Sequence, residues 1–499
     1  MLRKIRIFLA AISFLCCTLL FLDFTGTASS YFGWMAKIQF LPAVLALNVF
    51  VVVALLVLTL LLGRVYCSVV CPLGIFQDII AWVRRRIVRK KYSFSREKKW
   101  LRRVLLLMFI VSLALSATSI LAKLIEPYSA FGRIASNLFA PIWQWGNNAL
   151  AAAAESADSY LFYSTEVYVR SGVTLAVAAV SFVVVVVLAW RGGRTYCNTV
   201  CPVGTLLGFF SRFALLKPVI NAEKCINCKA CETKCKASCI DLANHKSDYR
   251  RCVACMNCID ACRKDALTYC LKKKAKNEKE VGKREEEQPE NASRRSFLIT
   301  SATLAATAAI KAQEKKVDGG LAVIKDRKEP DRKSHIVPPG ARGVRHFAQH
   351  CTSCQLCVSS CPEHVLVPSG NLHRFMQPEM NYDRGYCRTE CTRCSEVCPN
   401  GAIMKLTEEE KSSVQIGHAV WIKKNCVVIT DGVRCGNCAH HCPVGAITMV
   451  PLRADDEESP MVPAVNTERC IGCGACEHLC PARPYSAIYV EGHERHREI

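Results

Sequence analysis

Long uninterrupted runs of apolar residues dominate the first half of the chain. Four of them reach, or nearly reach, the length of about 20 residues that a helix needs to cross the hydrocarbon core of a membrane. They cover residues 5–22, 38–62, 104–125 and 173–190. We therefore expect residues 1–216 to form an all-α membrane domain with four spanning helices.

Basic residues are distributed unevenly between the segments that join these runs. A dense group of Lys and Arg lies at residues 84–103, whereas residues 126–171 hold only Arg133 and Arg170. Because basic loops stay in the cytoplasm, we expect residues 126–171 to lie on the outer side. No small-residue cleavage site follows the first run promptly, so we interpret that run as a retained anchor rather than as a signal peptide.

Beyond residue 216, cysteine-rich segments replace the apolar runs. Residues 217–270 and residues 346–499 are each expected to form an α+β ferredoxin-like unit, so that the whole chain is a multi-domain protein. Two linkers lie between these units. One is a charged stretch at 271–292, rich in Lys and Glu and without apolar periodicity, and the other is a polar stretch at 313–345.

Residues 293–312 resemble a twin-arginine export signal. The sequence Ser-Arg-Arg-Ser-Phe-Leu at 293–298 leads into an uncharged segment, rich in Ala and Thr, that ends near Ile310. The twin-arginine route carries folded proteins, and cluster-loaded domains must fold around their iron before they cross a membrane. We therefore expect residues 313–499 to be exported. The alternative is a chance Arg pair in front of an Ala-rich helix.

The composition of the chain indicates which cofactors and partners to expect. The chain has 32 cysteines and a formal net charge of +23. Cysteines spaced as Cys-x-x-Cys-x-x-Cys in a chain of this length indicate metal ligation rather than disulfides. The basic residues concentrate beside apolar runs and in one linker, which favours membrane lipid over nucleic acid as a partner. All 12 histidines lie at His245 or later and no Cys-x-x-Cys-His occurs, so the sequence predicts no haem.

Two ferredoxin-type runs with the spacing Cys-x-x-Cys-x-x-Cys-x-x-x-Cys lie within residues 217–270. In two-cluster ferredoxins three cysteines of such a run bind one [4Fe–4S] cluster and the fourth ligates the other cluster. Lys236 and Arg263 stand where proline usually follows the fourth cysteine, and the nearby Cys239 is either a substitute ligand or a spare thiol. Zinc is the rival metal for any four-cysteine set. The two runs are Cys225, Cys228, Cys231 and Cys235, and Cys252, Cys255, Cys258 and Cys262.

Residues 346–499 contain four more four-cysteine sets, and proline follows the last cysteine of each set. Proline there fixes the direction in which the chain leaves the site. Four sets imply four further [4Fe–4S] clusters, six in all. We favour a nested pairing, first set with fourth and second with third, with adjacent pairing as the alternative. The sets are Cys351, Cys354, Cys357 and Cys361; Cys387, Cys391, Cys394 and Cys398; Cys426, Cys435, Cys438 and Cys442; and Cys470, Cys473, Cys476 and Cys480.

The pattern Gly-Arg-x-Tyr-Cys-x-x-Val-Cys-Pro-x-Gly occurs twice, at residues 63–74 and 193–204, each time at the end of an apolar run. Cysteines at i and i+4 lie on one face of a helix. The two cysteine pairs therefore either meet and offer four thiolates to one more redox centre, or are buried thiols that mark an old duplication. The pairs are Cys67 with Cys71 and Cys197 with Cys201. The remaining cysteines, expected to be structural or without an assigned role, are Cys16, Cys17 and Cys270.

These features resemble two components of the quinol-oxidising branch of periplasmic nitrate reduction. Residues 1 to about 270 resemble the membrane subunit NapH in their apolar spans, their two repeats and their ferredoxin tail. Residues from Ser293 onward resemble NapG, the exported four-cluster partner. The resemblance implies a quinol dehydrogenase component of the bacterial inner membrane that passes electrons from (mena)quinol to a periplasmic reductase. Residues 217–270 would be cytoplasmic and residues 313–499 periplasmic. The alternative is a redox maturation factor, resembling CcoG, that reduces or handles metal for a respiratory complex.

Electron flow through such a chain poses two further questions. Quinol oxidation releases protons, so a carboxylate near the interface would help as a base. Glu126, in front of Pro127, is the one candidate, with an ordinary charge at a helix end as the alternative.

A hydrocarbon core of about 30 Å separates the cytoplasmic clusters from the exported ones, so electrons need a further redox centre between them. Either quinone or the four cysteines of the repeats would supply it.

Overall fold

The computed structural model describes residues 2–88, 92–114, 120–159, 162–168, 170–271, 328–453 and 459–499. They belong to one unit that comprises Met1–Leu271 and Lys328–Ile499. The expected twin-arginine segment at 293–312 lies outside the described residues, as do most of the charged linker and the first part of the polar linker.

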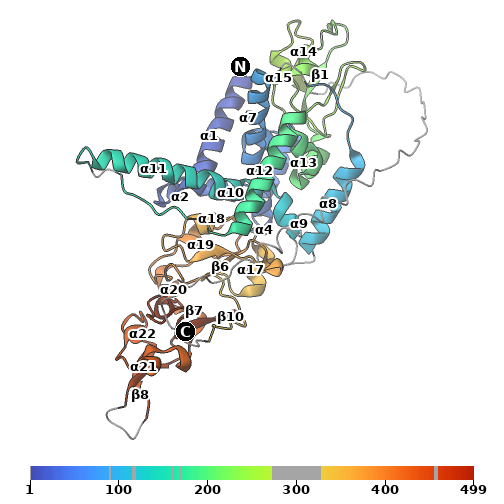
Figure 1. The fold of residues 1–499 in the computed structure, drawn as a ribbon. Helices are drawn as coiled ribbons and strands as arrows, with labels where there is room; N and C mark the ends of the chain where they lie inside the picture. Colours follow the sequence, from blue (N-terminus) through green and yellow to red (C-terminus); the bar gives the residue numbers. More distant parts are fainter. Residues whose placement is uncertain are drawn as a thin grey trace, which may run out of the picture. The chain divides into compact units, whose positions relative to one another are not determined.

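Two helices of the described residues are long and apolar enough to cross a membrane, α1 (Leu2–Leu22) and α12 (Gly172–Gly192). They correspond to the first and the fourth predicted spans, and Figure 1 shows them as long helices in the blue and green parts of the chain. The third predicted span contains α8 (Lys99–Ala114) and α9 (Ile120–Ile125), and residues 115–119 between them lie outside the described residues.

The second predicted span, 38–62, is not one helix. A turn at Leu47, whose φ is 53°, separates α4 (Phe40–Leu45) from α5 (Val49–Leu62). Asn48 begins α5, because its side-chain oxygen accepts a hydrogen bond from the amide of Val51 at 3.2 Å. Asparagine competes with the helix for backbone hydrogen bonds, so it starts a helix more readily than it continues one. The expectation of a continuous span at 38–62, and hence of four uninterrupted spans, is wrong.

Both copies of the repeated motif end one helix and begin another. Gly63 ends α5 with a φ of 72°, and Gly193 ends α12 with a φ of 67°, a region that glycine adopts without strain. A short helical turn follows, and proline then starts the next helix, where its fixed φ is favourable. The elements are α6 (Tyr66–Val69) and α7 (Pro72–Ile87) in the first copy, and η2 (Tyr196–Val200) and α13 (Pro202–Ser211) in the second. The helix therefore breaks between the two cysteines of each pair, and the expected single helix face is wrong.

The segment between α9 and α12 begins with α10 (Pro127–Ile134), which continues through the π-helical turn η1 (Ala135–Phe139) into α11 (Ala140–Glu155). Helix α11 runs across the direction of α1 and α12 (Figure 1). It exposes large apolar side chains, among them Trp143 and Trp145. Two short helices follow α1, namely α2 (Thr27–Phe32) and α3 (Trp34–Lys37).

The cysteine-rich segment after α13 is closed by its two ends. Strand β1 (Leu216–Ile220) pairs antiparallel with β4 (Leu267–Leu271), with Leu216 opposite Leu271. Between these strands lie α14 (Ala230–Lys234), the short hairpin of β2 (Ile240–Asp241) and β3 (Lys246–Ser247), and α15 (Asn257–Asp260). The result is a small α+β unit whose loops carry the cysteines.

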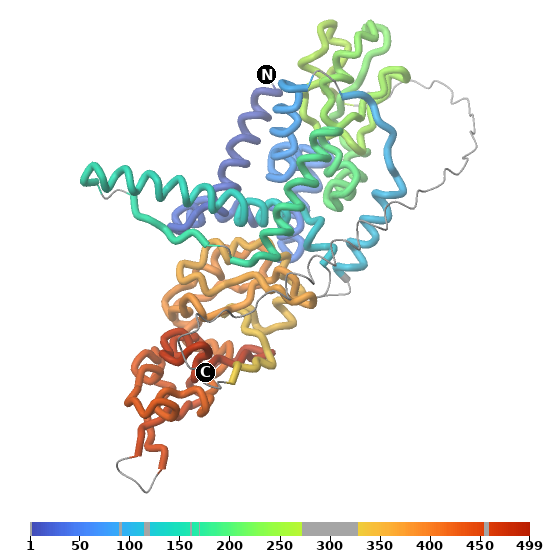
Figure 2. The backbone as a smooth tube through the Cα atoms, in the orientation of Figure 1, coloured from blue at the N-terminus to red at the C-terminus, as the bar shows by residue number. Residues whose placement is uncertain are grey.

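Residues 328–499 form short strand pairs joined by helical turns and loops, drawn in yellow to red in Figure 2. All three strand pairs are antiparallel: β5 with β6, β7 with β10, and β8 with β9. The strands are β5 (Leu366–Pro368), β6 (Pro378–Met380), β7 (Val414–Trp421), β8 (Ile447–Pro451), β9 (Met461–Val465) and β10 (Ile488–Glu498). The helices are α17 (Val344–His350), α18 (Leu356–Ser359), η3 (Leu372–Arg374), α19 (Arg393–Val397), α20 (Glu408–Ser413), η4 (Lys423–Asn425), α21 (Val427–Thr430), α22 (Asn437–His440) and α23 (Ala475–His478).

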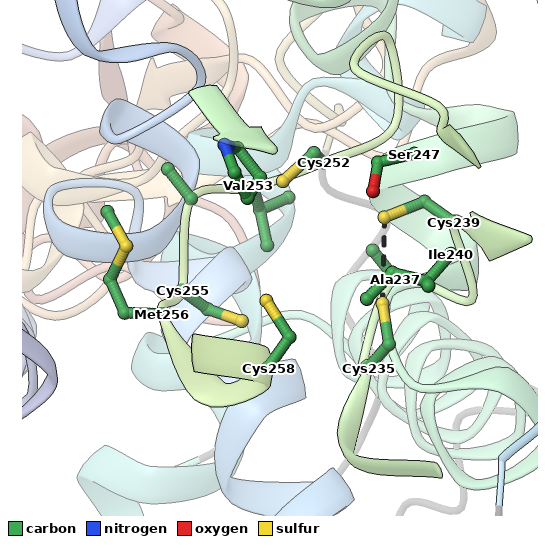
Figure 3. A pocket seen from close by; sticks show the side chains of 12 residues that line it. Cys235, Ala237, Cys239, Ile240, Ser247, Cys252, Val253, Cys255, Met256 and Cys258 are labelled. Carbon is green, nitrogen blue, oxygen red and sulfur yellow. Dashed lines mark hydrogen bonds between the residues drawn. The ribbon is translucent and has the colours of Figure 1, made fainter. Parts of the chain in front are cut away.

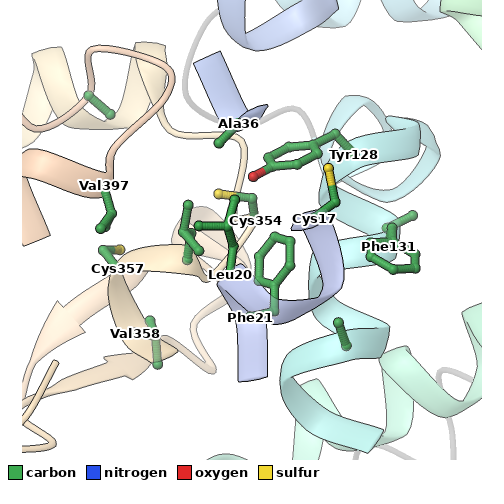
Figure 4. Close-up of a cluster of buried hydrophobic side chains, with 14 of the residues drawn as sticks. Cys17, Leu20, Phe21, Ala36, Tyr128, Phe131, Cys354, Cys357, Val358 and Val397 are labelled. Carbon is green, nitrogen blue, oxygen red and sulfur yellow. The ribbon is translucent and has the colours of Figure 1, made fainter. Parts of the chain in front are cut away.

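One hydrophobic core joins the helices to the first cysteine set of this C-terminal segment. Phe21 of α1 and Tyr128 of α10 are buried in the same cluster as Cys354 and Cys357 (Figure 4). Contact is closest at Gly132 of α10, where a Cβ atom would lie 2.5 Å from the carbonyl oxygen of Cys354 and 2.9 Å from the ring of Phe21. The backbones can approach this closely only because residue 132 has no side chain.

A buried carboxylate, Asp78 of α7, connects four segments of the chain. Its oxygens accept hydrogen bonds from Arg6 of α1 and from Nε of Arg194 at 2.7 Å, and they lie 3.1 Å from Nζ of Lys236. Three cations therefore share one anion away from water. Lys236 is the residue that stands where proline usually follows a ferredoxin cysteine, and this ion pair explains the departure.

We predict that Asp78→Asn lowers the free energy of unfolding by about 3–5 kcal/mol, because it leaves buried cations without their carboxylate. The matched control is Asp260→Asn, which breaks the exposed ion pair with Arg3 and is expected to cost at most about 1 kcal/mol. Thermal unfolding of the purified protein in detergent, followed by circular dichroism, measures both. Equal effects of the two substitutions would contradict the central role of Asp78.

Gly132→Ala is expected to destabilise the protein by about 1–3 kcal/mol, because the added methyl group overlaps the carbonyl of Cys354. Gly146→Ala is the control, since a Cβ at this α11 position meets no atom within 4 Å; it should be neutral or stabilising by up to about 1 kcal/mol. Unfolding midpoints and the rate of limited proteolysis compare the variants. A stable, protease-resistant Gly132→Ala protein would show that the close approach is not required.

Candidate functional site

The two ferredoxin-type runs of residues 217–270 exchange their fourth cysteine. Cys252, Cys255 and Cys258 of the second run line one cavity together with Cys235, the fourth cysteine of the first run (Figure 3). Three thiols from one loop and a fourth from the other run are the arrangement that a [4Fe–4S] cluster needs in a two-cluster ferredoxin. Of the three other cysteines of the first run, Cys225 and Cys231 pack in the same small core with Cys262, and Cys228 is exposed.

Cys239 lies in the same cavity as Cys235. The two sulfur atoms are 3.5 Å apart, joined by a hydrogen bond that is dashed in Figure 3. The hydrogen bond from Cys239 lowers the pKa of Cys235 to about 7, whereas the pKa of Cys239 itself is raised well above its usual value by its thiol neighbours Cys235 and Cys252. The lower pKa of Cys235 favours it over Cys239 as the cluster ligand.

The four regular Cys-x-x-Cys-x-x-Cys loops bend in the same way. In each loop the residues before and after the middle cysteine have a positive φ, which is uncommon for residues other than glycine. Two such residues turn the backbone around the space between the cysteines, so that the side chains converge. Spacing alone predicts the cysteines, but not these flanking positions. The pairs are Asn227 with Lys229, Ala254 with Met256, Ser353 with Gln355, and Gly472 with Gly474.

The first two cysteine sets of the C-terminal segment exchange ligands with each other. Cys361, the fourth cysteine of the first set, lines one cavity with Cys387, Cys391 and Cys394 of the second set. Within the same pair of sets, Asn400 donates to the hydroxyl oxygen of Thr352 at 2.6 Å.

That hydrogen bond ties the chain just after Cys398 to the loop that follows Cys351. The hairpin of β5 and β6 folds the intervening chain back and brings the two sets together. The nested pairing that the sequence favoured is therefore wrong, and the pairing is between adjacent sets.

The third and fourth sets are likewise neighbours. Asn437, beside Cys438, donates to the carbonyl oxygen of Leu479, beside Cys480, at 2.7 Å. Backbone amides also point at the sulfur atoms in these sets, from Ala446 to Cys442 at 3.2 Å and from Ala487 to Cys480 at 3.3 Å. Hydrogen bonds to cluster sulfurs are one of the factors that set reduction potentials.

Contacts between the sets arrange them in series. The first set touches the helices through Cys354, as the shared core shows, and the second set is joined to the first by exchange of cysteines. The amide of Cys387 in the second set donates to the carbonyl oxygen of Cys473 in the fourth set at 2.9 Å. The order in space is therefore first, second, fourth and third.

The four cysteines of the repeats are brought together and buried, each with between 2% and 4% of its surface exposed. The two repeats hold each other reciprocally. Arg64 donates to the carbonyl oxygen of Cys197 at 3.2 Å and lies 3.7 Å from the sulfur of Cys67. Arg194 donates to the carbonyl oxygen of Cys67 at 2.6 Å and lies 3.8 Å from the sulfur of Cys197.

Glu126 is not an exposed charge at a helix end. It is 1% exposed, and its carboxylate begins α10 by accepting hydrogen bonds from the amides of Tyr128, at 3.0 Å, and Ser129. Of the cysteines expected to be structural, Cys16 and Cys17 are buried in α1, and Cys270 is exposed on β4.

A further cavity lies where the segment after α11 meets the C-terminal segment. Apolar side chains of η1 and α11, including Leu138 and Trp145, line one part of it, and Glu166, Tyr168 and His364 line another. The rings of Tyr168 and His364 are 5.1 Å apart, edge to face. His364 is three residues after Cys361. Sequence reasoning missed this cavity, because its lining comes from segments nearly 200 residues apart and carries no motif.

Among the described residues, no three His, Cys, Asp or Glu side chains converge closely enough to hold a single metal ion. In a cubane cluster each thiolate binds a different iron atom, so the donors surround a cavity instead of meeting at one point. The cavities of Cys235 with Cys252, Cys255 and Cys258, and of Cys361 with its partners, have that form.

Two protein-family models match the chain. One, described as a 4Fe-4S binding domain, matches residues 44–91 and 174–221, and each stretch contains one copy of the repeat. The other, described as a 4Fe-4S dicluster domain, matches residues 350–414 and 433–483. The first of these two stretches holds the first and second sets, as the adjacent pairing requires. No solved structure matches the chain.

Several curated proteins are similar to parts of the chain. The ferredoxin-type protein NapF of Escherichia coli is 28% identical over 159 residues, which is 32% of this chain and 87% of NapF. The methylamine utilization ferredoxin-type protein MauM of Methylobacillus flagellatus is 29% identical over 170 residues, 32% of this chain and 70% of MauM. YccM of Escherichia coli, provisionally named as an electron transport protein, is 26% identical over 248 residues, 48% of this chain and 60% of YccM.

The chain is related to iron–sulfur electron-transfer proteins of the ferredoxin type.

Replacing Cys235 or Cys239 by serine should show which of the two cysteines is the cluster ligand. We expect Cys235→Ser to remove about four iron atoms per chain, one [4Fe–4S] cluster, and Cys239→Ser to retain the iron. Iron analysis and EPR of the anaerobically purified protein provide the measurement. Loss of the cluster from Cys239→Ser alone would reverse the assignment.

Proposed function

We propose that this protein is a membrane-bound electron-transfer component that oxidises quinol, menaquinol for instance, and passes the electrons through [4Fe–4S] clusters to a periplasmic reductase. The observation that carries this proposal is the series of cysteine sets that begins against the helices at Cys354 and continues away from them. A series of centres in contact with a membrane domain at one end suits the delivery of electrons from a lipid-soluble donor to a soluble acceptor.

The exposed surface of the helices supports a membrane location. Helices α1 and α12 expose large apolar side chains along their length, such as Phe8 and Val183. Helix α11 lies across them and exposes Trp143 and Trp145, a residue type enriched where a membrane meets water. We infer that α11 lies in the outer interface of the bacterial inner membrane.

Two contacts at opposite ends of α1 support opposite locations for the cysteine-rich segments. Arg3, at its start, pairs with Asp260 of the 217–270 unit, and Phe21, at its end, packs beside Cys354. From Arg3 to Phe21 the helix advances by 18 residues, a rise of about 27 Å. A hydrocarbon core is about 30 Å thick, so residues 217–270 fit a cytoplasmic location and residues 328–499 a periplasmic one.

Six clusters are proposed on the cysteine sets, each built from three cysteines of one set and the fourth of its partner. Burial raises the pKa of thiols in these sets, for example Cys354 and, to about 11, Cys351. Such thiols stay protonated without metal, and binding to iron deprotonates them. When bound, the clusters supply one-electron transfer, and the chain spaces and buries them.

We propose that quinol binds in the cavity lined by Trp145, Tyr168 and His364. Its apolar walls suit the ring and the start of the tail, and its polar end offers groups that can take protons. Oxidation of one quinol releases two electrons and two protons. A cluster held by Cys361 with Cys387, Cys391 and Cys394 would accept the electrons one at a time, and His364, three residues after Cys361, and the exposed Glu166 would take up the protons. Glu126, buried and engaged as a helix cap, is not needed for this step.

The resemblance to NapH and NapG gives this proposal its direction, since it implies a fused quinol dehydrogenase that faces outward. A maturation factor resembling CcoG is the alternative, and it predicts no rapid reduction by quinol. A series of four sets beyond the helices favours electron delivery.

Menaquinol added anaerobically to the purified protein should reduce the clusters, seen as bleaching of the visible absorbance and as new EPR signals. His364→Ala is expected to slow this reduction by about 10²–10⁴-fold, the contribution of a positioned proton acceptor. The control is His373→Ala, an exposed histidine of η3 in the same segment, which should leave the rate unchanged. Full reduction by dithionite with none by menaquinol would overturn the quinol donor.

A further inference from the structure

Seven buried cysteines lie outside the six sets, and four of them belong to the two repeats. These four are Cys67 and Cys71 of the first repeat and Cys197 and Cys201 of the second. Cys71 lies close enough to interact electrostatically with Cys67, Cys197 and Cys201. Cys201 likewise interacts with Cys67 and Cys197. Each repeat contributes one thiol from a helical turn and one from the residue before a proline, so the group has an approximate two-fold arrangement.

The surroundings of this group are positively charged and dry. Arg64 and Arg194 are fully buried. Arg194 shares the carboxylate of Asp78 with Arg6 and Lys236. The partners of Arg64 within the described part of the chain are the amide oxygen of Asn198, the carbonyl oxygens of Arg250 and Cys197, and the sulfur of Cys67. No carboxylate is among them. Buried cations in such excess require a further anion.

The second cysteine of each pair occupies a position that stabilises a thiolate. Cys71 is the residue before the 16-residue helix α7, and Cys201 is the residue before α13. The amide of Gly204 donates to the sulfur of Cys201 at 3.3 Å. Helix N-termini carry partial positive charge and lower the energy of a thiolate. The two arginines and the two helix starts thus place positive charge beside the sulfurs, as thiolates bound to a metal require.

We propose that Cys67, Cys71, Cys197 and Cys201 together hold a seventh iron–sulfur cluster, a cubane shared by the two repeats, which carries electrons between the 217–270 unit and the Cys351–Cys398 sets. Four thiolates and a cubane carry net negative charge, which compensates the surplus cations. One cluster serves both repeats, because each repeat supplies only two ligands.

The contacts on either side of the group mark the route. Towards the 217–270 unit, the amide of Arg194 donates to the carbonyl oxygen of Lys236 at 2.9 Å, and Lys236 directly follows Cys235. Towards the other side, Tyr66 donates to Gln39 at 2.9 Å, and Nε2 of Gln39 lies 3.8 Å from the sulfur of Cys17. Cys17 packs with Cys354 in one core (Figure 4).

Each transfer between neighbouring clusters moves one electron. The cluster on the Cys235 side is oxidised as the shared cluster is reduced, and the shared cluster then reduces the one at Cys354, or the reverse when the potentials are reversed. No covalent bond is formed and no proton is taken up. The inference rests on the proposed electron-transfer function, but not on quinol as the donor.

The first test is composition. We expect Cys197→Ser, in the full chain purified anaerobically, to lose about four iron atoms and one component of the EPR redox titration. Cys16→Ser, also buried in the helices, is the control and should keep both. Unchanged iron in Cys197→Ser, or stoichiometric zinc at this position in the wild type, would overturn the proposal.

A second variant tests the proposal without removing a thiol, in case Cys197→Ser does not fold. Arg64→Gln keeps all four thiols but removes a buried positive charge beside the cluster, which disfavours the more negative reduced state. We expect the EPR component that Cys197→Ser loses to show a lower midpoint potential in Arg64→Gln, while the iron content is maintained. Potentials identical to those of the wild type would show that no redox centre lies beside Arg64.

The third test is electron transfer across the bilayer. The wild type is placed in sealed, quinone-free liposomes, and dithionite is confined to the side of residues 328–499. We expect the clusters of the 217–270 unit to become reduced, and at least about tenfold more slowly in Cys197→Ser, a loss of about 1.4 kcal/mol or more in the barrier. Equal rates would overturn the bridge. Because dithionite is the donor, success here together with failure of menaquinol reduction would refute the quinol proposal alone.

Discussion

A single buried carboxylate holds the centre of this molecule together. Asp78 is shared by cations from α1, from the second repeat and from the residue after Cys235. Each of these cations would be costly to bury alone, because the interior cannot replace the water it loses. The anion therefore does more than add stability, since it fixes the register between the helices, the repeats and the ferredoxin-type unit.

The cysteine sets depend on a second constraint, which is that small loops cannot build a core by themselves. The loops around Cys354 and Cys357 share one hydrophobic core with Phe21 and Tyr128 of the helices. Close approach at Gly132 makes the contact possible. Because that contact holds the first cysteine set, the same packing that stabilises the loops also determines where the series of sets begins.

The two copies of the duplicated motif interlock with each other. Each arginine reaches across to the backbone of the other copy, and the glycine at the end of each motif leaves room for it. A Cβ at Gly74 would lie 2.6 Å from Arg194, and one at Gly204 would lie 2.8 Å from Arg64. Each motif therefore needs a residue without a side chain at this position so that the buried arginine of the other motif fits, and the resulting contacts hold the two repeats together.

Sequence by itself indicated the iron–sulfur character of this protein, because cysteine spacing is a local property of the chain. It identified the six cysteine sets, the repeats and the two long helices α1 and α12. It failed at Asn48, where a local hydrogen bond divides a helix within an apolar run, and at the pairing of sets, where a hairpin brings adjacent loops together. Only the tertiary structure decided which cysteines share a site, why lysine follows Cys235, and which residues line the cavity of Tyr168 and His364. Those answers depend on contacts between residues far apart in the chain, and no local pattern encodes such contacts.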